Sequence, residues 1–164
     1  MVQTDQKLEL LTPAPSYWPE IPQSLAKSLT PYAQEHGWKQ ALDWVGQEAN
    51  KPWLLDLATH FSRIRGLGLL PIQPEWKVLD FGAGWGVMTA GLAHKGCQTV
   101  ALEAAFERAA FLAERIRQEG LEDRVKVYCG GNTAQIPFPD QAFDCVVVNG
   151  VLEWIPTSMP GHPA

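Results

Sequence analysis

The stretch VLDFGAGWGVMTAGLA, residues 78–93, decides the fold. A short apolar segment passes through three glycines at alternate positions, Gly82, Gly84 and Gly86, into a segment of helical composition. A strand, a glycine turn and a helix in this order are typical of the βαβ units that build parallel sheets. Glycines in such a turn allow positive φ and let a ligand approach the backbone. The stretch therefore predicts an α/β fold with a ligand site at the turn, with a purely structural tight turn as the alternative.

The residues that follow repeat the pattern and predict a doubly wound parallel sheet. Helices are expected over 87–95, ending at Gly96, and over 104–118, ending at Gly120. The second helix should turn Phe106, Ala109, Ala110, Ala113 and Ile116 inward. The VVV run near residue 147 is typical of a strand buried on both faces. The four strands are expected over 77–81, 98–102, 125–129 and 143–148.

The first part of the chain, residues 1–70, is expected to be a helical arm, and residues 71–164 the ligand-binding domain. Up to Tyr17 the sequence holds Pro13 and Pro15 and shows no clear period, which predicts an irregular segment. A helix is expected to begin at Thr30 as its N-cap, with Pro31 at the first helical position. Its apolar face would carry Trp38, Ala41, Leu42, Val45 and Ala49.

A second helix of the arm is expected to open at Pro52 and to close at Gly66 or Gly68 in the left-handed conformation. Its inward face would carry Leu54, Leu57, Ala58, Phe61 and Ile64. The tryptophans of the arm, Trp18, Trp38, Trp44 and Trp53, allow two interpretations, a lid over the ligand site or a packing layer. Trp85, inside the glycine turn, would contact the ligand or cap the following helix.

Composition limits the function classes. The net charge of −5 arises from 13 basic and 18 acidic residues without a long run of either sign, which disfavours a nucleic-acid surface. Three separated cysteines in apolar surroundings favour buried thiols over disulfides, and four histidines lack ligand spacing, so no metal site is expected. The start MVQTDQKLEL lacks the basic and apolar stretches typical of a secretory signal, and no segment approaches the length of an apolar membrane span, so neither is expected. We expect a cytoplasmic protein.

The spacing of the glycines separates possible ligands. A dinucleotide fingerprint would need a third glycine at position 87, where the chain has Val87, and no triphosphate-binding loop is present. Asp80 precedes the first glycine and favours a ligand with a donor-rich end. Glu103 ends the second strand, where a carboxylate can accept bonds from both ribose hydroxyls, although it could instead be a helix-start charge. Asn132 follows two glycines, and its amide can meet an adenine edge or simply form a turn.

VLDFGAGWG, the ALEAA stretch and GNTAQIPFPDQAFDCVVVNGVLEWIP together resemble the class I S-adenosylmethionine-dependent methyltransferases, a Rossmann-like family. The resemblance runs from about Lys77 to Ile155. It implies that S-adenosylmethionine is the cofactor and that the glycine turn holds its methionine end. Glu103 would bind the ribose, Asn132 the adenine amine, and Asn149 the amino group of the donor. The implied cofactor residues are Asp80, Phe81, Gly82, Ala83, Gly84, Gly86, Glu103, Ala104, Asn132, Thr133, Ala134 and Asn149.

The resemblance also bears on catalysis. Methyl transfer needs chiefly alignment and desolvation, and Glu153 is the candidate general base if the acceptor must lose a proton. NGVLEW stands where enzymes that methylate nucleobases often have N-P-P-[YF], so a small-molecule acceptor is expected.

The family fold continues past the fourth strand, whereas this sequence ends in PTSMPGHPA. Its prolines, Pro156, Pro160 and Pro163, disfavour another strand. We therefore expect a piece of a longer enzyme, with a partner that covers the fourth strand's edge as the alternative. A non-catalytic binding module and, less favoured, an NAD-dependent oxidoreductase are the rival functions.

Overall fold

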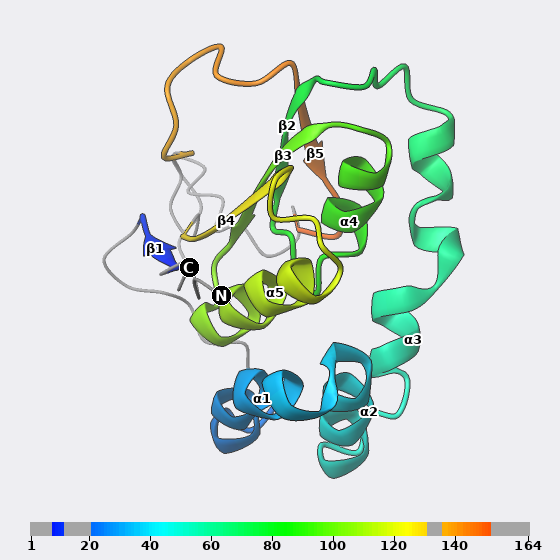
Figure 1. Cartoon of the computed structure of the whole chain (residues 1–164), viewed down its shortest axis with the longest axis vertical. Helices are drawn as coiled ribbons and strands as arrows, with labels where there is room; N and C mark the ends of the chain where they lie inside the picture. The colour runs from blue at the N-terminus through cyan, green and yellow to red at the C-terminus, as the bar shows by residue number, and fades with distance from the viewer. Residues whose placement is uncertain (1–7, 12–20, 131–135, 152–164) are drawn as a thin grey trace, which may run out of the picture.

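The computed structural model describes residues 8–11, 21–130 and 136–151. In these residues five parallel strands form one sheet in the order β1-β4-β3-β2-β5 (Figure 1). The α/β, Rossmann-like fold class is thereby confirmed. The strands are β1 (Glu9–Leu10), β2 (Lys77–Phe81), β3 (Gln98–Glu103), β4 (Val125–Cys129) and β5 (Cys145–Val148).

The four expected strands are present with small shifts at their ends. β3 includes Glu103, the acid expected at the strand end, and so extends one residue past the range 98–102; β5 begins at Cys145 rather than at Phe143. Phe143 instead packs against Phe138, with ring centroids 5.2 Å apart. Strand ends follow backbone pairing, which the apolar pattern does not record.

Helices α4 (Val87–His94) and α5 (Phe106–Gln118) connect the central strands and cover one face of the sheet. Ala93 of α4 and Leu112 of α5 lie in one buried cluster with Ala101 of β3. Both helices end as expected, with Gly96 at φ 95° and Gly120 at φ 68°. The opposite face is covered by a cluster that includes Phe138, Phe143 and Val151, from the segments that flank β5.

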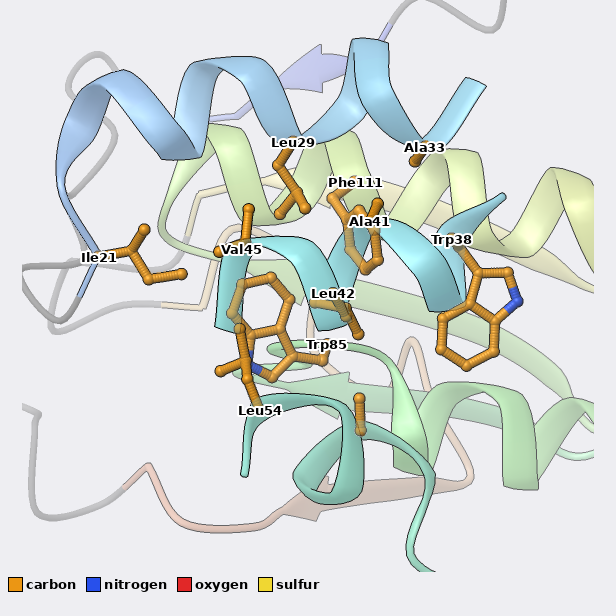
Figure 2. Close-up of a cluster of buried hydrophobic side chains, with 11 residues drawn as sticks. Ile21, Leu29, Ala33, Trp38, Ala41, Leu42, Val45, Leu54, Trp85 and Phe111 are labelled. Atoms are coloured by element: carbon orange, nitrogen blue, oxygen red, sulfur yellow. The ribbon is translucent and has the colours of Figure 1, made fainter. Parts of the chain in front are cut away.

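The helices of the N-terminal part form a further layer on α5. α1 (Gln23–His36) and α2 (Trp38–Glu48) pack against each other and on α5, and α3 (Leu54–Thr59) follows α2 (Figure 1). Their cluster takes in Trp85 from the glycine turn and Phe111 from α5, as Figure 2 shows. The arm and the sheet domain therefore share a core.

The expected start of the first helix is wrong. α1 begins at Gln23, seven residues before Thr30, and Pro31 lies inside it. An internal proline costs one backbone hydrogen bond, and the burial of Leu29 and Ala33 on either side of it offsets this cost. The helical pattern is interrupted instead at Gly37, whose φ of 94° separates α1 from α2.

The second helix of the arm is shorter than expected. α3 ends at Thr59, and two 3₁₀ turns, η1 (Phe61–Arg63) and η2 (Arg65–Gly68), continue the chain. Neither Gly66 nor Gly68 is among the glycines with positive φ, so a left-handed closure there is wrong. A 3₁₀ turn shares enough of the helical period to give the same sequence pattern over a few residues.

Three further expectations fail at the edges of the fold. Glu9–Leu10 is not irregular but pairs with Tyr128 and Cys129 of β4; residues 12–20 lie outside the described part. The β5 strand is not buried on both faces, since Val146 is 46% and Val148 39% exposed. Phe106 lies at the helix start and is 44% exposed, whereas Phe111 and Leu112 form the buried face of α5.

Candidate cofactor site

The three glycines of the turn after β2 all adopt positive φ, at 74° for Gly82, 56° for Gly84 and 81° for Gly86. Two of them are also required by packing. A Cβ on Gly82 would overlap Val151, and one on Gly86 would overlap Leu112. The nearest atom to a Cβ on Gly84 would be the Gly82 carbonyl oxygen, 3.9 Å away. Gly84 is thus the glycine whose side-chain position is open to a ligand.

Hydrogen bonds hold this turn against the end of β3. The N–H groups of Gly82 and Ala83 both donate to the Leu102 carbonyl, at 2.8 and 3.1 Å. The Gly84 N–H donates to Glu103 Oε2 at 2.8 Å. The open backbone of the turn and the acidic end of β3 are therefore one rigid unit.

Asp80 lies at the end of β2, under the turn, and is 2% exposed. Its Oδ2 accepts a hydrogen bond from Thr89 Oγ1 of α4 at 2.6 Å. Burial, with a smaller contribution from the negative charge of Glu103, raises the pKa of Asp80 to about 6, although the Thr89 hydrogen bond opposes this. The carboxyl group is positioned to hold a proton or to face a cation.

Glu103 is 1% exposed and accepts four hydrogen bonds. Besides the Gly84 bond, Oε1 accepts from the Ala105 N–H at 2.9 Å and from Arg108 Nε and Nη2 at 3.1 and 2.6 Å. Its side chain is fixed at the point where the turn opens. Because the Ala105 N–H lies at the N-cap of α5, the helix-start interpretation of Glu103 stays a prediction beside the ribose interpretation.

The N-terminal helices pack against the glycine turn through Trp85. Trp85 is 6% exposed, belongs to the cluster of Figure 2 and meets Phe111 edge-on at 5.6 Å. Arg115 of α5 donates to the Trp85 carbonyl at 2.7 Å and to the Ala58 carbonyl at 3.2 Å, and its guanidinium lies 4.1 Å from the Trp38 ring centroid. Burial lowers the pKa of Arg115. Trp85 thus anchors the turn to the helical layer.

Sequence reasoning missed Arg108 and Arg115. Arg108 stands five residues after Glu103, in the first turn of the next helix, so an acid-to-base spacing of five was the available signal. The sequence shows only the i,i+4 pair of Arg115 with Glu119; its two carbonyl partners at the turn, Trp85 and Ala58, are 30 and 57 residues away in the chain and gave no signal.

The other expected residues fall into three groups. Phe81 and Ala83 are buried beside the turn, and Ala104 is half-buried after β3. Asn149 is exposed just after β5. Asn132, Thr133, Ala134 and Glu153 lie outside the described residues.

The described residues also bear on the expectations about metal ligands, cysteines and membrane spans. These residues contain no group of three or more potential metal ligands. Cys97 and Cys129 are buried free thiols, and Cys145 is half-buried. The helices in the described ranges are all too short or too polar to cross a membrane.

Comparison with known proteins decides the family. A family model described as a methyltransferase domain matches residues 79–160, which is half of the chain. The chain belongs to this family. Its cofactor is S-adenosylmethionine. No curated protein matches the chain.

One solved structure supports the fold, and two others match with lower TM-scores. A putative S-adenosylmethionine-dependent methyltransferase from Methanococcus maripaludis is 20% identical, with a TM-score of 0.52 over 74% of this chain and 52% of that one. A methyltransferase from Aquifex aeolicus is 22% identical, with a TM-score of 0.49 over 57% and 53%. One from Geobacter sulfurreducens, in complex with S-adenosyl-L-homocysteine, is 21% identical, with a TM-score of 0.49 over 57% and 38%. The chain thus matches about half or less of the length of these structures.

The residues present fit this methyltransferase cofactor. A nucleoside with a charged tail needs an approachable backbone and an acceptor for its ribose hydroxyls. The open position of Gly84 and the buried carboxylate of Glu103 provide both within one hydrogen-bonded unit.

Proposed function

We propose that this protein is a methyltransferase that uses S-adenosylmethionine to methylate a small-molecule acceptor. The observation that carries the proposal is the Gly84 N–H bound to Glu103 Oε2, with open space at the Gly84 side-chain position. Asp80, Phe81, Gly82, Ala83, Gly84, Gly86, Glu103 and Ala104 form the cofactor side of the site. Asn132, Thr133, Ala134 and Asn149 complete it on the adenine and amino-group sides.

The role of the side chains of this site is to bind and orient the cofactor, because methyl transfer needs chiefly alignment of the reacting groups. When bound, the cofactor would supply a methyl group activated by a positively charged sulfur. Glu103 fixes the ribose, and the rigid turn fixes the tail, so the attack geometry is set in advance. Asp80, whose pKa is raised by burial, can ionise when a cationic tail lies above it. Glu153 remains the candidate acceptor for a proton that the substrate must lose.

A small acceptor is favoured by charge. The net charge of −5, without a long basic run, does not suit a polyanionic substrate. NGVLEW after VVV also lacks the N-P-P-[YF] pattern.

The proposal is tested by calorimetric titration of the chain with S-adenosylmethionine, with NAD as the control ligand. We expect saturable binding of the first only. Gly84→Ala should weaken this binding about tenfold or more, because its Cβ enters the ligand space. Gly120→Ala is the matched control, since Gly120 also has positive φ and open surroundings, at φ 68°, but ends α5 away from the site. Equal binding by both variants, or saturable NAD binding, would contradict the proposal.

Binding without turnover would favour the second candidate, a cofactor-binding module that acts with a partner. The observation in its favour is the exposure of Val146 and Val148 on β5, the last strand in the sheet order. Sedimentation of the chain over a range of concentrations, together with transfer of labelled methyl groups to candidate acceptors, distinguishes the two.

A further inference from the structure

Protein donors use most of the acceptor capacity of Glu103. A carboxylate offers about four lone-pair positions, two on each oxygen. Four N–H groups donate to Glu103: those of Gly84 and Ala105, and Nε and Nη2 of Arg108. Oε1 takes three of these donors and Oε2 takes only the Gly84 N–H, so one lone-pair position, on Oε2, is left. A ribose diol would bring two further donors, so at least one of the present donors must give way when both hydroxyls bind.

Only one of the partners of Glu103 can leave without unfolding the site. The Gly84 N–H belongs to the glycine turn, which is held by the bonds of Gly82 and Ala83 to the Leu102 carbonyl, and the Ala105 N–H lies at the start of α5. Arg108, by contrast, holds its two donors at the end of a long side chain that is 22% exposed. The number of donors that Arg108 contributes equals the number that a ribose diol contributes.

The surroundings also offer the guanidinium another position. Arg108 lines a hollow at the start of α5, together with Ile21, Leu29 and Trp85. Its guanidinium carbon lies 6.0 Å from the centroid of the Trp85 ring, at the limit of a cation–π contact. A swing towards Trp85 would keep the positive charge beside an aromatic face.

We propose that Arg108 and the ribose diol of the cofactor are alternative partners of Glu103, so that Arg108 sets the affinity and the selectivity for ligands with an intact diol. This inference rests on the proposed role of Glu103 in the cofactor site. While it pairs with Arg108, Glu103 is kept from the ribose. The apparent affinity is then the intrinsic affinity multiplied by the fraction of molecules in which the pair is broken. In return, the buried carboxylate is never left without a partner.

The test is calorimetric titration with S-adenosylhomocysteine of the wild-type chain, Arg108→Met and Arg108→Lys. We expect Arg108→Met to bind about three- to thirtyfold more tightly, because no side chain competes for Glu103. Arg108→Lys should fall between, since an ammonium keeps the charge but loses the two-donor fork. Should Arg108→Met not fold, the lysine variant still decides the matter. Unchanged or weaker binding by the folded variants overturns the proposal.

A second comparison separates competition from a general loosening of the fold. Adenosine and 2′,3′-dideoxyadenosine differ only in the hydroxyls, so the gain from Arg108→Met should be seen with adenosine and be absent with the dideoxy compound. Arg117→Met is the matched control, because Arg117 forms an equally short ion pair with Glu114, 2.6 Å, on the same helix. Equal gains for both nucleosides, or a gain in the control, overturn the proposal.

Glu103→Gln distinguishes this proposal from the one on which it rests. If the glutamine variant binds S-adenosylhomocysteine as the wild type does, Glu103 is not the ribose acceptor and the proposed site fails. If Glu103→Gln weakens binding but Arg108→Met does not tighten it, the site stands and the competition by Arg108 is refuted.

Discussion

At the scale of single residues, the site is built around carboxylates that the fold removes from water. Asp80 and Glu103 end neighbouring parallel strands and are 2% and 1% exposed. Glu103 is compensated by an arginine and two backbone donors, whereas Asp80 has the Thr89 hydroxyl. Glu103 therefore has a positively charged partner and Asp80 a neutral one, which suits a ligand with a neutral ribose and a cationic tail.

The raised pKa of Asp80 predicts a pH-dependent stability. An acid whose pKa rises from 3.8 to about 6 on folding binds more protons in the folded state between these values. This group's contribution to stability is therefore present below about pH 4 and is lost as the pH rises through about 6, by about 3 kcal/mol. Asp80→Asn mimics the protonated form and escapes this loss.

The measurement is the free energy of urea unfolding of wild type and Asp80→Asn at intervals from pH 4 to pH 7. The variant should gain stability relative to the wild type across this range. A difference between the two that does not change with pH would refute the predicted shift.

At the scale of elements, one side chain of α5 organises the junction of two helices. Gln118 Nε2 donates to the Ala33 carbonyl near the end of α1 at 2.7 Å, and its Oε1 accepts from the Trp38 N–H at the start of α2 at 2.8 Å. Helix ends carry backbone groups without helical partners. Across the break at Gly37, the Gln118 amide supplies the acceptor for the Trp38 N–H and a second donor for the Ala33 carbonyl, which also accepts from the Gly37 N–H at 2.9 Å.

Gln118→Met should destabilise the protein by about 1–3 kcal/mol, because the Trp38 N–H loses its hydrogen-bond partner in a partly buried position. Urea unfolding measures the change. Gln47→Met, at an exposed position of α2, is the control and should stay within about 0.5 kcal/mol of the wild type. A similar effect of both substitutions would show that the junction does not depend on Gln118.

At the scale of the whole molecule, the helical layer and the sheet domain are held by a shared core. Phe111 of α5 is fully buried and lies in one cluster with residues of α1, α2 and α3 and with Trp85 of the glycine turn. Arg115 links the same parts through two carbonyls. The division at residue 70 remains a proposal about domains, and this packing favours unfolding as one unit.

Phe111→Ala should cost about 3–5 kcal/mol by leaving a cavity between the layers. Phe106→Ala, on the same helix but 44% exposed, should cost less than about 1 kcal/mol. Denaturation followed by tryptophan fluorescence and by far-ultraviolet circular dichroism should give coincident transitions for the wild type. Separate transitions would show that the helical layer unfolds independently.

The sequence by itself determined the central sheet and its glycine turn. The apolar runs of β2 and β4, the positive φ at Gly82, Gly84 and Gly86, and the acids at two strand ends follow from local pattern and backbone sterics. Periodicity, glycine freedom and strand-end position are properties of neighbouring residues, so they can be read before folding.

Only the tertiary structure decided what those residues contact. Pro31 is tolerated inside α1 because buried neighbours offset its cost, and Glu9–Leu10 becomes a strand because β4 offers an edge. Val151 and Leu112, which are distant in the chain, leave no room for a side chain at Gly82 and Gly86, whereas the side-chain position of Gly84 is open. The pairing of Glu103 with Arg108 and of Arg115 with the Trp85 carbonyl likewise arises from side-chain geometry, which no sequence period records.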